Sequence, residues 1–298
     1  KTTKNATPIS QIQIEQIKRK STGDNELDLV LGGGVVSGSL VLIGGSPGIG
    51  KSTLLLKIAS NLANDNQKVL YVSGEESASQ IKLRADRLNA NSDNLFLLTE
   101  IDLSSILAEV AKNEYKAIVI DSIQTLYSDK ISSAPGSISQ VREITFELMR
   151  LAKKDDIAIF IIGHITKEGS IAGPRILEHM VDVVLYFEGD SSKELRILRG
   201  IKNRFGTTSE VGIFEMRSNG LVSAKDISSK FFTRGSAVSG SAITVTMEGS
   251  RALVVEIQAL VCESSYPKRS STGFDRNRLD MILALLEVLV AKHCLLSK

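Results

Sequence analysis

The chain has 298 residues, of which 42% are hydrophobic and 23% charged. This is the composition of a globular protein, and it excludes disordered and collagen-like chains. At ~150 residues per domain, the length suggests about two domains. Two cysteines exclude a disulfide-dense secreted scaffold and a four-cysteine zinc site within this chain. The net charge of +2 excludes a non-specific polycation but leaves room for a local basic channel.

Targeting signals are also missing from the sequence. No apolar run approaches the ~20 residues that cross a bilayer. The first 30 residues contain no apolar segment of the kind found in signal peptides. We therefore expect a cytoplasmic protein without a membrane partner. Because the chain begins at Lys1 and not at Met, we expect a processed, trimmed or partial chain.

Apolar runs alternate with helix-like patterns over the first two thirds of the chain, after a polar arm or linker over residues 1–20. The runs that predict buried strands are 39–45, 69–74, 117–122 and 157–164. The segments with helical spacing are 52–64, 76–88, 103–112 and 139–155. Continuously apolar strands between helices predict an α/β fold, with a mostly parallel sheet covered on both faces.

The pattern changes after residue 180. Four short apolar segments predict antiparallel strands added at one edge of the sheet: 183–189, 194–203, 211–216 and 220–224. Beyond residue 226 the sequence predicts a hairpin over 241–249 and 252–261, and a helix over 278–291. The expected organisation is an arm at 1–20, a large domain at 21–225 and a smaller segment at 226–298.

The strongest motif is GSPGIGKS at residues 45–52, which fits G-x-x-x-x-G-K-[ST] between a predicted strand and a predicted helix. Its glycines let backbone N–H groups converge on a phosphate, and the following helix adds its positive end. We expect Lys51 to neutralise the β- and γ-phosphates of ATP and Ser52 to bind Mg²⁺. The expected nucleotide-binding residues are Gly45, Ser46, Pro47, Gly48, Ile49, Gly50, Lys51, Ser52 and Thr53.

Polar residues at the ends of the other strands complete the expected site. Asp121 ends the run AIVID and is expected to hold Mg²⁺ through water, while Glu75, next to Glu76, is the candidate base for the attacking water. His164 is a candidate sensor of the γ-phosphate and adds to the nucleotide-binding residues. The alternatives are a solvated acidic turn for Glu75 and a plain histidine at a strand end for His164.

Six motifs together resemble one family. They are GSPGIGKST, YVSGEES, QIKLRADRL, VIDSIQTL, GHITKEGSIAGPRILEHMVD and KNRFG at residues 202–206. The chain is similar over about residues 20–287 to the bacterial RadA (Sms) family of RecA-like ATPases. The resemblance implies a RecA-like P-loop NTPase core, followed by a partial Lon-protease-like α+β segment. It also implies a DNA-dependent ATPase of recombinational repair that couples ATP hydrolysis to single-stranded DNA binding and branch migration.

The resemblance further implies a hexamer that binds single-stranded and branched DNA and works with a recombinase of the RecA type. Lys202 and Arg204 would reach the γ-phosphate bound by the neighbouring subunit. The loops 128–138 and 166–178 would face DNA, with Lys130, Lys167 and Arg175 as the cations for its phosphates. The alternatives are a basic turn at a strand edge and solvated surface loops.

Both ends of the chain depart from the family pattern. RadA-like proteins usually begin with a four-cysteine zinc module, whose ligands are absent here, and the Lon-like match stops after Glu287. Because no Ser–Lys dyad can be assigned, we expect no proteolysis. Two other functions stay open: an ATP-binding switch or scaffold without DNA remodelling, and a small-molecule kinase. The kinase is disfavoured because no arginine-rich lid segment follows the core.

Overall fold

The computed structural model describes residues 8–11, 18–64, 67–164, 176–189, 194–224, 239–263 and 269–296. Contacts divide the chain into two units. The first unit comprises residues 1–234 and 244–255, and the second comprises 235–243 and 256–298. All residues expected to bind nucleotide belong to the first unit.

A nine-stranded sheet forms the centre of the first unit. Six neighbouring strands run parallel, in the order β8-β3-β7-β6-β4-β5. They are β3 (Leu40–Gly45), β4 (Lys68–Ser73), β5 (Leu95–Thr99), β6 (Tyr115–Asp121), β7 (Ala158–His164) and β8 (Val183–Glu188). Every residue of β3 is buried, as expected for a strand covered on both faces. The structure therefore confirms the α/β fold with a mostly parallel sheet.

Two strands differ from the sequence-based expectation. The segment at 183–189 was expected to be antiparallel, and this was wrong: β8 pairs parallel to β3, with Val41 opposite Val183. The helix α6 (Ile176–Met180) precedes β8 in the chain and packs on one face of the sheet. Strand β8 therefore starts at the same end of the sheet as β3 and runs in the same direction. Strand β5 was not predicted, although residues 95–98 are all apolar; it is the edge strand of the sheet, and three of its five residues are exposed.

The antiparallel addition consists of three strands beyond β8. They are β9 (Leu195–Asn203), β10 (Val211–Arg217) and β11 (Gly220–Ser223). A separate small pairing joins β1 (Arg19–Lys20) to β2 (Val35–Val36). A 3₁₀ turn, η1 (Ile9–Gln11), precedes them.

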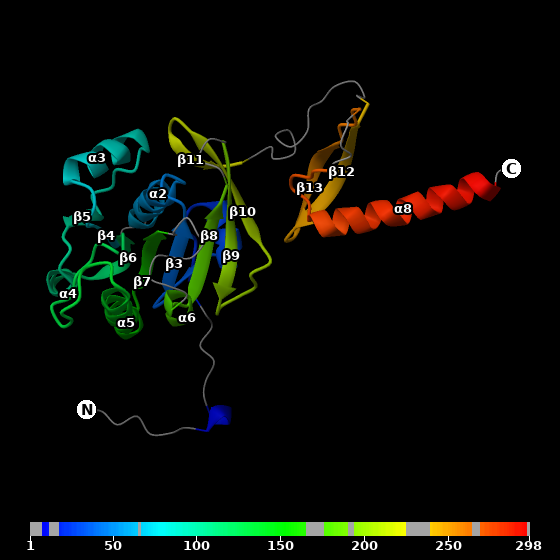
Figure 1. Ribbon diagram of the computed structural model, residues 1–298. Helices are drawn as coiled ribbons and strands as arrows, with labels where there is room; N and C mark the ends of the chain where they lie inside the picture. The colour runs from blue at the N-terminus through cyan, green and yellow to red at the C-terminus, as the bar shows by residue number, and fades with distance from the viewer. Residues whose placement is uncertain are drawn as a thin grey trace. The chain divides into compact units, whose positions relative to one another are not determined.

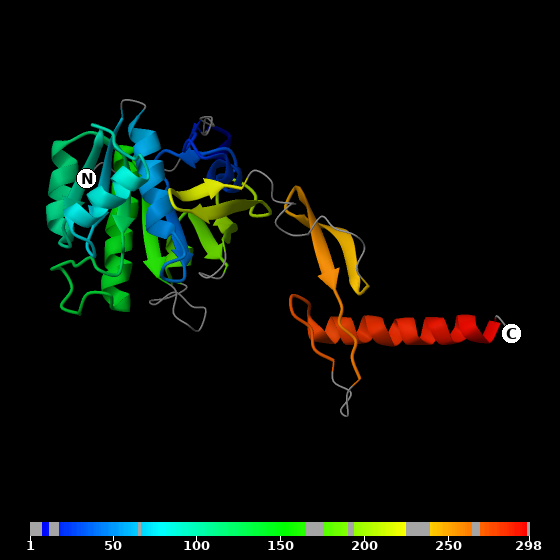
Figure 2. The ribbon, with the colours of Figure 1, turned by 90° about the horizontal axis from the view of Figure 1, so that it is seen from above.

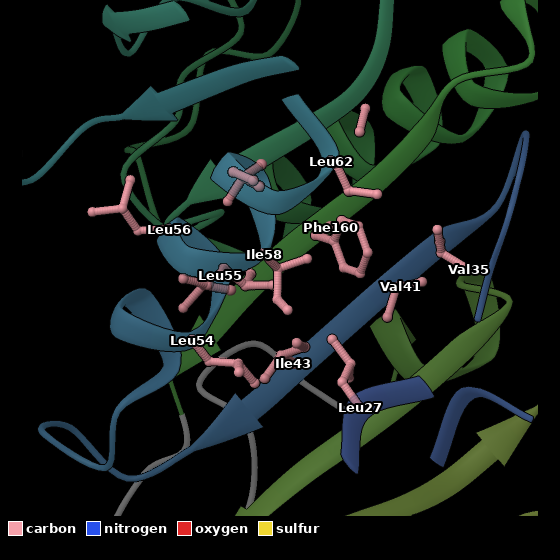
Figure 3. Packing of buried hydrophobic residues seen from close by; sticks show 14 of the residues in the cluster. Leu27, Val35, Val41, Ile43, Leu54, Leu55, Leu56, Ile58, Leu62 and Phe160 are labelled. Atoms are coloured by element: carbon pink, nitrogen blue, oxygen red, sulfur yellow. The ribbon is translucent and has the colours of Figure 1, made fainter. Parts of the chain in front are cut away.

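Helices cover both faces of the sheet (Figure 1). On one face lie α1 (Asn25–Leu31), α2 (Lys51–Ala63) and α3 (Ala78–Arg87), and on the other lie α4 (Leu103–Lys112), α5 (Ile138–Asp155) and α6. Leu54 and Ile58 of α2 pack toward Ile43 and Phe160 of the sheet, and all four are fully buried (Figure 3). This packing fixes the start of α2 at the carboxyl end of β3.

The C-terminal part contains a two-stranded sheet of β12 (Ser241–Glu248) and β13 (Arg251–Gln258), and the helix α8 (Arg276–Leu296); Figure 2 draws them in orange and red. The predicted hairpin and the helix at 278–291 are thereby confirmed. Where the structure describes the chain, none of its helices is long and apolar enough to cross a membrane.

Candidate nucleotide-binding site

The phosphate-binding loop at residues 45–52 connects β3 to α2. Gly48 and Gly50 have positive φ angles of 74° and 116°, which favour glycine. A Cβ atom at Gly50 would lie 2.6 Å from Leu221 Cδ1, so a larger residue there would have to displace the Leu221 side chain in addition to adopting an unfavourable φ. Gly50 is also the N-cap of α2 and makes no side-chain cap hydrogen bond. The first N–H groups of α2 are thus left for an anion.

Lys51 lies inside this loop. Its Nζ donates to the carbonyl oxygens of Gly45 at 2.8 Å and Ser46 at 3.0 Å. Burial lowers the pKa of Lys51 to about 8, although the charges of Asp121 and Glu75 act in the opposite direction. An entering phosphate would oppose this effect of burial, because it supplies negative charge directly beside the ammonium group.

Asp121 lies at the end of β6, beneath the start of α2. Its Oδ2 accepts a 2.6 Å hydrogen bond from the Tyr71 hydroxyl, and the Ser52 hydroxyl lies beside the same carboxylate. Burial raises the pKa of Asp121, while these two hydroxyl groups lower it. Burial also raises the pKa of Tyr71 well above its usual value, so the phenol keeps its proton and acts as a donor.

The ends of β4 and β6 bring the acidic residues to the same edge. The N–H of Gly74 donates to the Asp121 carbonyl at 3.0 Å, and Glu75 Oε1 accepts from the Ser122 hydroxyl at 2.5 Å. A cis peptide bond joins Asp121 to Ser122. Glu76 forms an ion pair with Arg84 of α3 instead. Of the two neighbouring glutamates, Glu75 is the one that contacts the segment following Asp121.

His164 ends β7 opposite Gly45 in the parallel register, so its backbone lies beside the phosphate-binding loop. Lys130 forms an ion pair with Glu147 at 3.0 Å. Lys167 and Arg175, the other two candidate DNA-binding cations, lie outside the described residues.

Lys202 and Arg204 lie at the opposite end of the sheet from the loop that binds phosphate. Lys202 Nζ donates to the carbonyl oxygens of Glu178, His179 and Val181 at the end of α6, between 2.7 and 3.1 Å. Arg204 Nη1 donates to Asp182 Oδ1 at 3.0 Å, and its side chain is 46% exposed. Burial lowers the pKa of Lys202, and the charge of Arg204 lowers it further.

The position of Asp182 shows how far these cations are from the loop of their own chain. Asp182 Oδ2 accepts from the N–H of Leu40, the first residue of β3, at 3.1 Å. Strand β3 then runs from Leu40 to Gly45, a length of about 16 Å at about 3.3 Å per residue. The two cations and the phosphate-binding loop therefore lie at opposite ends of one strand.

Several polar residues of these two regions were not expected from the sequence. Tyr71 and Ser122 contact the two acidic residues, while Asp182 binds Arg204. Arg19 Nη2 donates to the Phe205 carbonyl at 2.5 Å. Tyr71 and Asp121 lie on different strands, so only the register of β4 against β6 brings them to one face of the sheet. The contacts of Arg19 and Asp182 join distant segments, and no local pattern signals them.

The donor set fits a nucleotide bound with Mg²⁺. Lys51 and the N-terminal end of α2 supply the positive charge and N–H groups that suit phosphate. The side-chain oxygens of Ser52 and Asp121 suit Mg²⁺. Magnesium commonly binds one or two protein oxygens, together with phosphates and water. Across the described part of the chain, no group of three or more His, Cys, Asp or Glu side chains is placed to hold a metal by itself. The nucleotide would therefore complete the coordination of the ion.

A phosphate-binding loop between β3 and α2, with a buried carboxylate at the end of β6, defines a P-loop nucleotide-binding protein on a RecA-like core. Residues 7–170 match the family model described as an AAA domain. The fold resembles that of the RadB recombinase (TM-score 0.53, 22% identity, 69% of this chain and 99% of that one). It also resembles a DnaB-like replicative helicase (TM-score 0.61, 17% identity, 71% of this chain and 63% of that one).

Sequence comparison narrows this class. The chain is 72% identical over 285 residues to DNA repair protein RadA of Campylobacter jejuni, covering 96% of this chain and 64% of that protein. It is 54% identical over 289 residues to DNA repair protein RadA of Bacillus subtilis, covering 96% and 63%. The chain belongs to the RadA family of DNA repair proteins, and it spans somewhat less than two thirds of these two relatives.

Proposed function

We propose that this protein is a DNA-dependent ATPase of recombinational repair. The observation that carries the proposal is the phosphate-binding loop itself: Lys51 and the uncapped start of α2 are positioned for phosphate, beside the oxygens of Ser52 and Asp121. In this proposal Mg²⁺ is bound by Ser52 and Asp121 together with ATP, and it neutralises charge on the phosphates. The family membership supports a role in DNA repair.

Glu75 is proposed to orient the attacking water. It lies on the segment that follows β4 and accepts a hydrogen bond from Ser122, next to Asp121. A carboxylate at this edge can accept a proton from water within hydrogen-bond reach of the γ-phosphate. His164, whose backbone lies beside Gly45, is proposed to sense that phosphate.

Lys202 and Arg204 are proposed to act on ATP bound by a neighbouring subunit. They lie at the far end of β3 from their own phosphate-binding loop, and Arg204 is half exposed. A head-to-tail ring, here a hexamer, brings opposite ends of adjacent subunits together. Each site would then take its loop from one subunit and its cations from the next.

DNA is proposed to bind at the loops that follow β6 and β7, with Lys130, Lys167 and Arg175 contacting its phosphates. Binding through phosphates would be strongly salt-dependent and largely independent of sequence. The proposed consequence is branch migration of recombination intermediates, in the cytoplasm, together with a recombinase of the RecA type.

ATP hydrolysis measured with and without single-stranded DNA tests this function. We expect DNA to stimulate turnover, and Lys51→Ala to abolish turnover in both conditions because the phosphate loses its cation. Lys57→Ala is the matched control, since Lys57 lies six residues further along α2 and pairs with Asp24. Turnover that DNA leaves unchanged would favour an ATP-binding switch or scaffold. Normal turnover by Lys51→Ala would contradict the assignment of the loop.

A further inference from the structure

Tyr71 is a buried tyrosine on the floor of the nucleotide site. It lies in β4, opposite Val119 of β6 on one side and Leu97 of β5 on the other, and is 1% exposed. Its ring belongs to the hydrophobic core beneath α2. The ring is surrounded by apolar residues, whereas the hydroxyl group lies at the polar end, near the charges of Arg84 and Glu76, and donates to Asp121 Oδ2 at 2.6 Å.

The surroundings of Asp121 give this hydrogen bond its importance. Asp121 is 7% exposed, so water supplies few donors to its carboxylate. Tyr71 donates the side-chain hydrogen bond that the structure shows to this carboxylate, and Ser52, the residue that would bind Mg²⁺, lies beside it. When Ser52 turns toward the metal, Tyr71 is the donor that continues to hold the carboxylate. A buried carboxylate without such a donor is destabilised.

We propose that Tyr71 is a positioning residue for Mg²⁺: its hydroxyl fixes Asp121 Oδ2, so that the rest of the carboxylate faces the ion bound at Ser52. Tyr71 itself contacts neither nucleotide nor metal. Its phenol suits this role because it orients the carboxylate without adding a positive charge that would compete with Mg²⁺. The inference rests on the proposed nucleotide function and assigns one further residue to it.

The test separates this role from simple packing. Tyr71→Phe removes one hydroxyl group and keeps the ring. Tyr115→Phe is the matched control, because the Tyr115 hydroxyl also donates to a carboxylate, that of Glu109 at 3.0 Å, at the other end of β6. For the complete chain and both variants, the affinity for a fluorescent ATP analogue is measured with Mg²⁺ and with EDTA. Thermal melting without nucleotide reports on folding.

We expect Tyr71→Phe to bind the analogue normally in EDTA but to lose about tenfold of the affinity that Mg²⁺ adds, the loss typical of a buried hydrogen bond to a charged group. Tyr115→Phe should keep the full Mg²⁺ effect. The same Mg²⁺ effect in Tyr71→Phe as in the unchanged protein would overturn the inference. Absence of any Mg²⁺-dependent binding by the unchanged protein would instead overturn the proposed function.

A second measurement applies if Tyr71→Phe fails to fold. The chain has five tyrosines, so fluorotyrosine can be incorporated throughout, and the Tyr71 signal assigned by replacing each of the other four with Phe. We expect the fluorine resonance of Tyr71 to move when Mg²⁺ is added to the ATP complex. A resonance that stays in place would overturn the inference.

Discussion

The side chain of Arg204 is held by contacts within its own chain and is still partly exposed. Asp182, which is 2% exposed, accepts a hydrogen bond from Arg204 Nη1, and the backbone N–H of Arg204 donates to the Asp182 carbonyl. These contacts fix the direction of the side chain, while about half of it remains exposed. A pre-oriented cation loses little entropy when it binds a phosphate.

Arg204→Ala should therefore reduce turnover and leave ATP binding nearly unchanged. A cation that acts on the transition state of phosphoryl transfer contributes about 10³-fold or more to the rate. Turnover is measured at saturating ATP, and affinity with a fluorescent ATP analogue. Arg276→Ala, which removes another exposed arginine paired with an aspartate, is the control. Turnover of Arg204→Ala within a few-fold of the unchanged protein would contradict the role.

At the scale of elements, Glu26 links three segments of the first unit. Its Oε2 accepts from the N–H of Ile213 in β10 at 2.8 Å, and its Oε1 accepts from Arg251 in β13 at 2.8 Å. Leu253 of β13 is buried nearby with Val211 and Ile213. The start of α1, the antiparallel edge of the sheet and the beginning of β13 are thus connected through one buried carboxylate.

Glu26→Ala should destabilise the protein by about 1–3 kcal/mol, because the buried N–H of Ile213 loses its side-chain acceptor. The midpoint of unfolding in urea measures the effect. Asp86→Ala is the control: it removes an exposed ion pair with Lys82 on α3 and should change the midpoint little. Equal midpoints for the two variants would show that the buried contact contributes no more than the exposed one.

At the scale of the whole molecule, the proposed ring makes each site a shared one. The loop carrying Lys51 and the turn carrying Arg204 lie at opposite ends of β3, so one subunit cannot supply both to a single nucleotide. Two inactive variants could then restore each other when they occupy adjacent positions.

Mixing Lys51→Ala subunits with Arg204→Ala subunits should recover activity that neither variant has alone. In a ring assembled at random from equal amounts, about a quarter of the interfaces combine an intact loop with an intact arginine. Turnover should therefore reach up to about a quarter of that of the unchanged protein. Subunit exchange before the assay is checked by mass measurement. A mixture that exchanges subunits and stays inactive would contradict the shared site.

The sequence by itself determined the class of fold and the centre of the site. Unbroken apolar runs between helical segments indicate a buried parallel sheet, because residues covered on both faces have no polar alternation. The residues of the motif at 45–52 are sufficient to determine the shape of the loop: glycines permit the turn, and Lys51 and Ser52 follow at the start of the helix. Both features depend on residues that are close together in the chain, so they can be predicted from the sequence.

The tertiary structure alone decided which distant residues meet. The parallel direction of β8 depends on where the chain passes over the sheet, and the short strand β5 is defined by its neighbour β4. The contacts Tyr71–Asp121 and Arg204–Asp182 likewise join residues 50 and 22 positions apart. A hydrogen bond depends on distance in space. Residues this far apart along the chain come within hydrogen-bonding distance only after the sheet has assembled.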